Sequence, residues 1–364
     1  MKVGIVLNYV RHDFTYAALK TAEVLRNMGY SITLFDKSAN NKSARSKLHW
    51  YWNDFVLSDV ETHFDDWLDD CDIVLWFTYP TAKEVKTLYT NDIPNVCVAS
   101  WDSVDSETVS AIKGCGAIVC PSKMQKVYLE EYWRLKDVHF IPFDSNFPLT
   151  NSGRLTGDDI RIMVACPGYQ IKRVDHSKLF SALYQVMEKN KNVEIDFLYS
   201  NKVASQIKIN IPKYEKTFEG GNSIRCVDDP TGWSEGPLAY GLCDIVLWPV
   251  QLESFGYVAI EALSVGTPVI AYNHLPMSEI VSDHVNGFLI SCESKDTDMG
   301  LSYAVHNEKG IIDVIEKIAT DTSLLNKVKL GTHKGLEERK KMFYALWDGV
   351  LDEVSRFKPR KGKK

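Results

Sequence analysis

The sequence predicts an α/β fold of two domains, each built on a doubly wound parallel sheet. Short, β-branched apolar runs alternate with stretches of helical periodicity, which is the pattern of successive β-α-β units. The pattern breaks at residues 146–159, a segment rich in Gly, Asn, Thr and Pro, and then begins again. The hexapeptide CDIVLW stands once in each half, at 71–76 and 243–248. The same strand in two similar domains explains this repeat, and so does chance, because buried strands use few residue types.

Residues 1–150 are predicted to form the first domain. The run KVGIVLNY fits a strand buried on both faces. Residues 15–28 have helical periodicity and are closed by Gly29, a residue common after helix ends, and SITLFD fits the next strand. Three further strands are expected from the runs DIVLWF, NVCVAS and GAIVCPS.

Residues 151–335 are predicted to form the second domain. Its expected strands are the runs IRIMVAC, VEIDFLYS, SIRCVDD, DIVLWPV and TPVIAYN. A helix over 336–355 is expected to pack back toward the first domain. The basic tail 356–364 is expected to be disordered.

Composition narrows the class of protein. Of the 364 residues, 45% are hydrophobic and 25% charged, as in soluble globular proteins. A net charge of −6 gives no overall electrostatic reason to bind nucleic acid or anionic lipid. The apolar runs are too short for a signal peptide or a membrane helix. The eight cysteines form no CxxC pair and no Cys/His cluster, so we expect reduced thiols and a cytoplasmic protein.

The second CDIVLW continues into QLESFGYVAIEAL, and this segment predicts an anion site. Ser254, Phe255 and Gly256 fit a turn from strand to helix, with Ser254 as the N-cap. Free N–H groups at a helix start attract an anion, and Gly256 would let a phosphate come close. A turn after a parallel strand lies at the sheet edge where α/β folds bind ligands.

Two glutamates flank this turn. Glu253 and Glu261 are eight positions apart, about 12 Å if the whole segment is helical. That separation suits a ligand with hydroxyl-rich groups on both sides of a phosphate bridge, such as a nucleotide sugar. The alternative is two exposed glutamates on a helix, which the flanking apolar strands disfavour.

Residues 253–261 resemble the E-x7-E motif of retaining GT-B glycosyltransferases, particularly glycosyltransferase family 4. The resemblance continues through ALSVGTPVIA, LPMSEIV and NGFL, and CPGYQIKRVD at 166–175 is similar to the family's "GRL…EKGVD" segment. Together these segments cover most of residues 160–290. The resemblance implies a GT-B architecture of two Rossmann-like domains facing across a cleft, the first binding the acceptor and the second the nucleotide sugar.

The resemblance also implies roles for single residues. Glu261 would bind the donor ribose, Glu253 the hydroxyls of the donor sugar, and Lys172 the diphosphate, so that Glu253 and Lys172 are the catalytic candidates. The family arginine falls on Pro167, so that either Arg173, next to Lys172, replaces it or the donor is held differently. The donor-binding set is completed by Ser254, Phe255, Gly256 and Tyr257.

The acceptor side is expected in the first domain. Arg11, His12 and Asp13 follow the first strand in a loop where the family often has two glycines. Trp101 and Asp102 stand where many relatives carry a histidine or an acidic residue near the reacting sugar. Asp102 has two interpretations: it orients or deprotonates the acceptor, or it caps a helix that begins near Val104.

The expected function is transfer of a hexosyl or pentosyl unit from a nucleotide sugar to an acceptor hydroxyl, with retention and without a metal. The nucleotide sugar is a co-substrate, and no cofactor is expected. Two Asp-x-Asp strings, at 70–72 and 296–298, are not interpreted as metal sites, because the first precedes its strand and the second is expected in a polar loop.

Other functions stay open. The segment 42–52, KSARSKLHWYW, joins basic and aromatic residues that can contact phosphates and stack on bases, so DNA bearing hydroxymethylated bases is an alternative acceptor. The same residues can stack on sugars or anchor a loop, and the net charge favours a saccharide or other small hydroxyl compound. A nucleotide-sugar epimerase and a non-catalytic donor-binding protein are further alternatives.

Overall fold

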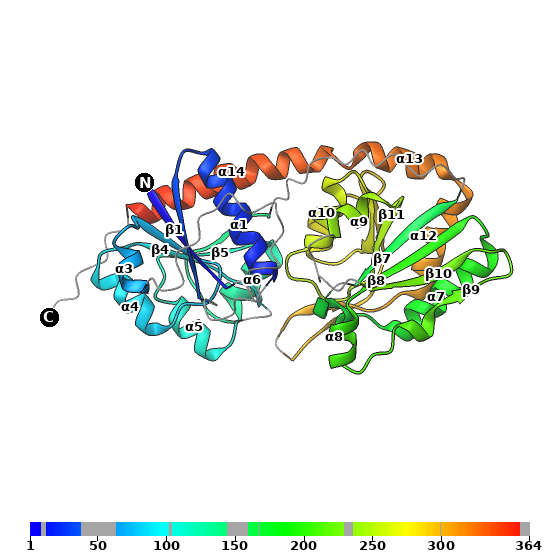
Figure 1. Ribbon diagram of the computed structural model, residues 1–364, viewed down its shortest axis with the longest axis horizontal. Helices are drawn as coiled ribbons and strands as arrows, with labels where there is room; N and C mark the ends of the chain where they lie inside the picture. Colours follow the sequence, from blue (N-terminus) through cyan, green and yellow to red (C-terminus); the bar gives the residue numbers. More distant parts are fainter. Residues whose placement is uncertain are drawn as a thin grey trace. The chain divides into compact units, whose positions relative to one another are not determined.

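The computed structural model describes residues 1–8, 12–37, 63–101, 104–143, 159–166, 168–228, 236–298 and 300–356. The chain divides into two compact units, each an α/β structure around its own sheet (Figure 1). The first unit contains Met1–Asp144 and Arg339–Lys364, and the second contains Ser145–Glu338.

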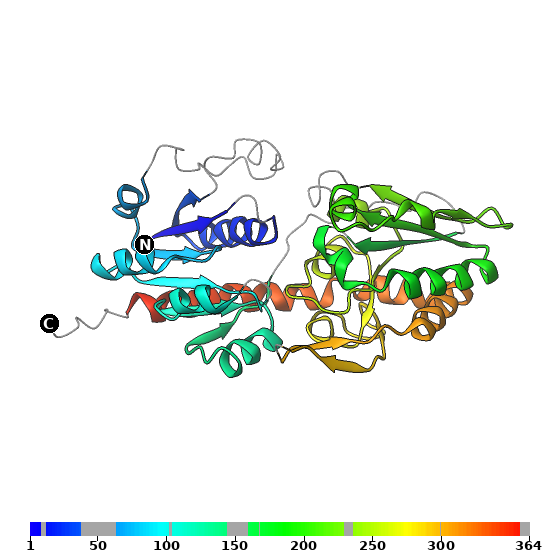
Figure 2. The ribbon, with the colours of Figure 1, turned by 90° about the horizontal axis from the view of Figure 1, so that it is seen from below.

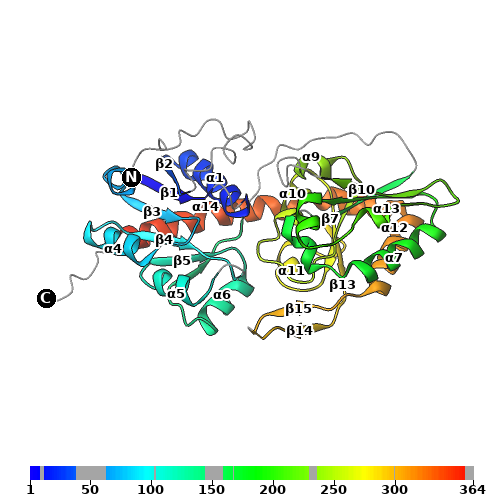
Figure 3. The same ribbon diagram turned by 60° about the horizontal axis from the view of Figure 1, so that its bottom comes forward.

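The first unit has a six-stranded, wholly parallel sheet in the order β2-β1-β3-β4-β5-β6 (Figure 3). Its central strands are buried along their whole length, which explains why they read as unbroken apolar runs. The strands are β1 Lys2–Leu7, β2 Ser31–Asp36, β3 Ile73–Trp76, β4 Asn95–Val98, β5 Ala117–Cys120 and β6 Val138–Phe140. The helices are α1 His12–Asn27, α3 Phe64–Leu68, α4 Ala82–Thr90, α5 Ser106–Ile112 and α6 Lys123–Glu131.

The second unit has a seven-stranded sheet in the order β13-β12-β11-β7-β8-β10-β9, in which only β9 runs antiparallel. The sheet strands are β7 Ile160–Cys166, β8 Val193–Tyr199, β9 Lys216–Thr217, β10 Ser223–Asp228, β11 Ile245–Trp248, β12 Val269–Tyr272 and β13 Gly287–Ile290. A separate hairpin, β14 Ser294–Asp296 and β15 Ser302–Ala304, extends from the body of this unit (Figures 2 and 3).

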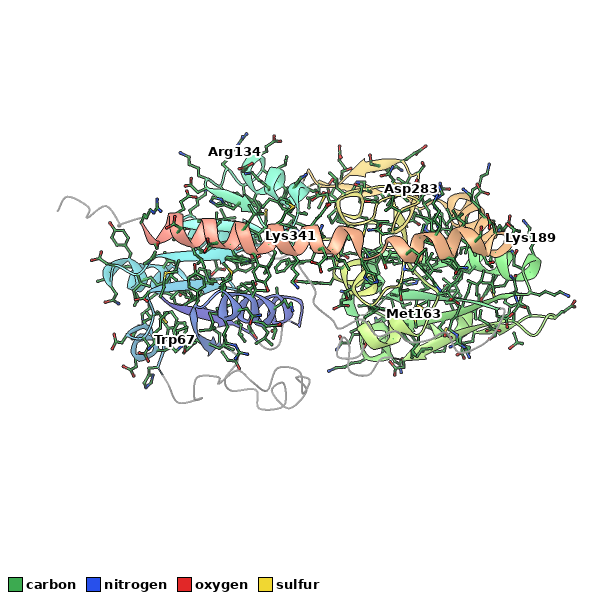
Figure 4. All side chains as sticks on the ribbon, turned by 90° about the horizontal axis from the view of Figure 1, so that it is seen from above. Trp67, Arg134, Met163, Lys189, Asp283 and Lys341 are labelled. Atoms are coloured by element: carbon green, nitrogen blue, oxygen red, sulfur yellow. The ribbon has the colours of Figure 1, made fainter. Side chains whose placement is uncertain are left out.

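The helices of the second unit lie between its strands or, in the case of the last two, after them. They are η3 Gly168–Arg173, α7 His176–Lys189, α8 Asn201–Gln206, η4 Pro212–Tyr214, α9 Gly236–Gly241, α10 Tyr257–Ser264, α11 Met277–Ile280, α12 Glu308–Thr320 and α13 Thr322–Gly331. The last helix, α14 Lys334–Ser355, begins in the second unit and belongs to the first from Arg339 onward. There Trp347 packs on Phe77, with ring centroids 6.3 Å apart (Figure 4 labels Lys341 on the same helix).

The two CDIVLW copies occupy equivalent positions. β3 pairs in parallel with β1, the first strand of its unit, and β11 pairs in the same way with β7. In each copy the aspartate forms two hydrogen bonds with the backbone of a residue at the start of the neighbouring strand, the first residue of β1 and the second of β7. The amide of Asp72 donates to the carbonyl of Lys2, and its Oδ2 accepts from the Lys2 amide at 2.6 Å. Asp244 bonds the backbone of Arg161 through the same two groups, with an amide-to-Oδ2 distance of 3.0 Å.

This shared pair of hydrogen bonds gives the hexapeptide a structural role in both units. Because Asp72 and Asp244 bond the backbone of a neighbouring strand, an Asp-x-Asp string in the sequence is not by itself a sign of a metal site. Asp70 forms an ion pair with Lys2 Nζ at 2.6 Å, next to the hydrogen bonds between Asp72 and the Lys2 backbone. The prediction that Asp296 lies in a polar loop was wrong, because Asp296 is the last residue of strand β14. In the described part of the chain, no helix is long and apolar enough to span a bilayer.

Candidate active site

The turn between β11 and α10 is organised by Glu253. This side chain is 5% exposed, and its Oε1 accepts hydrogen bonds from three consecutive backbone amides. The donors are Ser254 at 2.7 Å, Phe255 at 3.0 Å and Gly256 at 3.3 Å. The carboxylate therefore satisfies amides just before the helix start, which would otherwise need another acceptor.

The prediction that Ser254 caps this helix was wrong. The N-cap of α10 is Gly256, in the left-handed region with φ 72°, and no side chain accepts a capping bond there. A Cβ at Gly256 would lie 2.3 Å from Ile280 Cδ1 and 2.7 Å from Met277 Cε. Glycine is thus required by backbone conformation and by packing on α11, and not only by the approach of a ligand.

Glu261 lies in the interior of α10, whose residues are all buried. Its side chain is 3% exposed, and Oε2 has no hydrogen-bond partner among the residues that the structure describes. Burial raises the pKa of this carboxyl well above the ordinary glutamate value. The alternative of two exposed glutamates is therefore wrong. Because α10 begins only at Tyr257, the distance expected for a fully helical segment does not apply either.

The aromatic residues of the turn pack inside the unit. Phe255 and Tyr257 are 2% and 5% exposed, and their rings stack with centroids 5.0 Å apart. These two buried rings therefore have a packing role in the turn, and they are not exposed to a ligand.

Two basic residues lie beside the glutamate turn. Lys172 and Arg173 end η3, which follows β7, the neighbour of β11 in the sheet. The carbonyl of Arg173 accepts from the Gln251 amide at 3.0 Å, and its Nη1 donates to the Leu252 carbonyl at 3.3 Å. Lys172 is exposed. The structure therefore brings the predicted cation segment against the residues that lead into Glu253.

The expected acceptor-side residues are only partly described. His12 and Asp13 begin helix α1, so they do not belong to a loop as predicted. Trp101 is 6% exposed, and its amide donates to Gln125 Oε1 at 3.2 Å. Arg11, Asp102, Pro167 and residues 42–52 lie outside the described residues.

The helix after Trp101 is capped by a residue that the sequence did not single out. Helix α5 begins at Ser106, and Oδ1 of Asp105 accepts from the amides of Glu107 and Thr108. A cap by Asp102 for a helix starting near Val104 is therefore wrong. Hydrogen bonds from Thr108 are the main cause that lowers the pKa of Asp105.

Sequence reasoning also missed Gln251, which stands two positions before Glu253 and links three segments of this unit. The only signal was a polar residue between an apolar strand and a glutamate. Within the described ranges, no three His, Cys, Asp or Glu side chains come close enough together to hold a metal ion.

This fold and site define a class of protein. The two Rossmann-like parallel sheets are those of GT-B glycosyltransferase structures, which confirms the predicted fold class. Residues 231–310, which lie in the second unit, match the family "Glycosyl transferases group 1".

Relatives are similar over parts of the chain. An uncharacterized 41.2 kDa protein in the cps region of Klebsiella pneumoniae is 39% identical over 85 residues, 21% of this chain and 24% of that protein. The D-inositol 3-phosphate glycosyltransferase of Segniliparus rotundus is 41% identical over 68 residues, 17% of this chain and 15% of that enzyme. The matches thus span about a quarter or less of these relatives' lengths.

A solved structure is similar over the whole chain. HepE of Anabaena, in complex with UDP and glucose, superposes with a TM-score of 0.69. The superposition covers 97% of this chain and 100% of HepE, at 12% sequence identity. At that identity the likeness concerns the fold.

Proposed function

We propose that this protein is a retaining glycosyltransferase that moves a sugar from a nucleotide-sugar donor to an acceptor hydroxyl without a metal. One observation carries the proposal. Two buried glutamates, Glu253 and Glu261, stand on either side of a helix start, beside the cations of η3. They lie at the carboxyl edge of a GT-B sheet, in the segment that matches the group 1 family. A buried carboxyl with a raised pKa, as at Glu261, is typical of functional sites.

Each residue has a defined part in this proposal. Glu261 accepts hydrogen bonds from the ribose hydroxyls, which supply the partner that its buried Oε2 lacks among the described residues. Glu253, held by three backbone amides, is a fixed acceptor for hydroxyls of the donor sugar. Lys172, with Arg173 beside it, and the start of α10 stabilise the diphosphate as negative charge develops on it.

The acceptor hydroxyl then attacks the anomeric carbon on the face that the diphosphate leaves, and the departing phosphate takes its proton. We propose a saccharide or another hydroxyl compound as the acceptor, the nucleotide sugar as the co-substrate, and no cofactor. The DNA alternative rests on residues 42–52, which lie outside the described part of the chain, and no observation on the described residues favours it.

The test is a thermal-shift screen of UDP, GDP, ADP and TDP sugars, followed by transfer and hydrolysis assays with the best donor. A donor at 100 times its Kd should stabilise the protein by about 2.7 kcal/mol. NMR of the product should show the anomeric configuration of the donor. An epimerised nucleotide sugar would indicate an epimerase, and binding without turnover would indicate a donor-binding protein. An inverted product would refute retention.

A further inference from the structure

The β14–β15 hairpin is attached to the turn that carries Glu253. The Ala304 amide at the end of β15 donates to the Gln251 carbonyl at 2.8 Å, and the Gln251 side chain returns a bond from Nε2 to the Ala304 carbonyl at 3.0 Å. Ala304 is fully buried. This two-way bond joins segments that are 53 positions apart in the chain.

The same glutamine also holds η3. Its amide donates to the Arg173 carbonyl at 3.0 Å, so all three of its backbone and side-chain bonds cross to another segment. The hairpin has a second attachment at the sheet edge, where Nε2 of His274 lies 3.2 Å from Ser302 Oγ. The hairpin base is closed by the Val305 amide, which donates to the Glu293 carbonyl at 2.7 Å.

We infer that Gln251 is a positioning residue for Glu253, and that the β14–β15 hairpin is its support. The inference rests on the proposed function for its catalytic consequence. Gln251 and Glu253 are separated by one residue, and that residue, Leu252, is itself held by Arg173 Nη1. A loosened Gln251 therefore lets the Glu253 carboxylate and the Lys172–Arg173 segment move independently, although both must meet one donor. Positioning errors of this kind lower turnover more than binding.

The test uses the full chain with four variants. Gln251→Leu removes the Nε2 donor at similar size, Gln251→Glu replaces that donor with a carboxylate, and Ser302→Ala weakens only the second attachment. Gln185→Leu, on the exposed face of α7, is the matched control. Hydrogen–deuterium exchange of the amides of residues 254–256, which needs no ligand, reports on the turn directly.

We expect the exchange of these amides to rise about tenfold in both Gln251 variants, which is the effect of losing one ordinary hydrogen bond. Ser302→Ala should give a smaller rise, and Gln185→Leu none. With the donor found in the screen, kcat should fall about tenfold in the Gln251 variants. The KM for the donor and the Kd of its free nucleoside diphosphate should stay within about twofold.

Wild-type exchange in the Gln251 variants would overturn the positioning role. Faster exchange with wild-type kcat would overturn its catalytic consequence. Faster exchange in a protein whose wild type transfers no sugar would leave the positioning role intact and refute the proposed function.

Discussion

Replacing Glu261 by glutamine should weaken donor binding and stabilise the donor-free protein. The side chain is 3% exposed, and its Oε2 lacks a hydrogen-bond partner among the described residues. A hydrogen bond to a charged group contributes about 1.5–3 kcal/mol, and each 1.4 kcal/mol changes Kd about tenfold. Losing one such bond to the donor ribose should raise Kd about 10- to 150-fold. Glutamine keeps a neutral acceptor, so Glu261→Gln should raise Kd by the smaller factor, whereas Glu261→Ala should raise Kd by the larger one.

The stability change should depend on pH. Burial raises the pKa of Glu261 above its value of 4.5 in the unfolded chain, so the folded state holds this proton more tightly. The resulting stabilisation is fully present below about pH 4.5 and is lost as the pH rises through the folded-state pKa. Glutamine does not titrate. The stability of Glu261→Gln relative to wild type should therefore increase from pH 4.5 toward pH 8.

Two assays check this reasoning. Isothermal titration calorimetry gives the Kd of the donor, and urea unfolding at several pH values gives the free energy of unfolding. Glu219→Gln, at an exposed site in the turn before β10, is the control and should change neither quantity. Wild-type affinity in Glu261→Gln would refute the ribose role. A stability difference that does not vary with pH would refute the raised pKa.

The remaining predictions concern the turn and the metal. Glu253→Ala should destabilise the fold by about 1–3 kcal/mol or more, because three amides lose their acceptor, whereas Glu253→Gln should stay folded and lose turnover. Equal melting temperatures for the two variants would contradict this. Gly256→Ala should cost about 2–5 kcal/mol, since a Cβ meets Ile280 and Met277 at a positive φ. A wild-type urea midpoint would argue against that packing. Transfer activity should persist in excess EDTA, and a loss that magnesium or manganese reverses would rule out the metal-free mechanism.

Much of the fold was predictable because parallel strands buried on both faces need unbroken apolar runs. SITLFD and IRIMVAC match β2 and β7 residue for residue. The short strands were not found, since β6 has three residues and the β14–β15 hairpin is mostly polar and exposed. Such strands form because a neighbour pairs with them, and their own composition carries little signal.

The candidate site was predicted in its residue types but not in its bonds. The pair Glu253 and Glu261 was visible from spacing and resemblance. The sequence could not show that Glu253 accepts from its own turn, because Ser254 is the better cap by propensity and only the left-handed Gly256 redirects the amides. The same applies to Asp105, which caps α5 in a position where the sequence offered Asp102.

The sequence by itself determined two parallel sheets, a buried strand of the same sequence in each domain, and a glutamate pair at a sheet edge, whereas the pairing of that strand with the first strand of each unit came from the structure. These features follow from local patterns of burial and turn chemistry. The tertiary structure alone decided what lies around that pair. Arg173, Gln251 and Ala304 meet through backbone carbonyls and amides, which nearly all residue types carry, and through one side-chain bond from Gln251 Nε2. The pattern of side chains along the sequence therefore does not predict their contact. The contact forms only when η3, the loop after β11 and the hairpin fold onto one another.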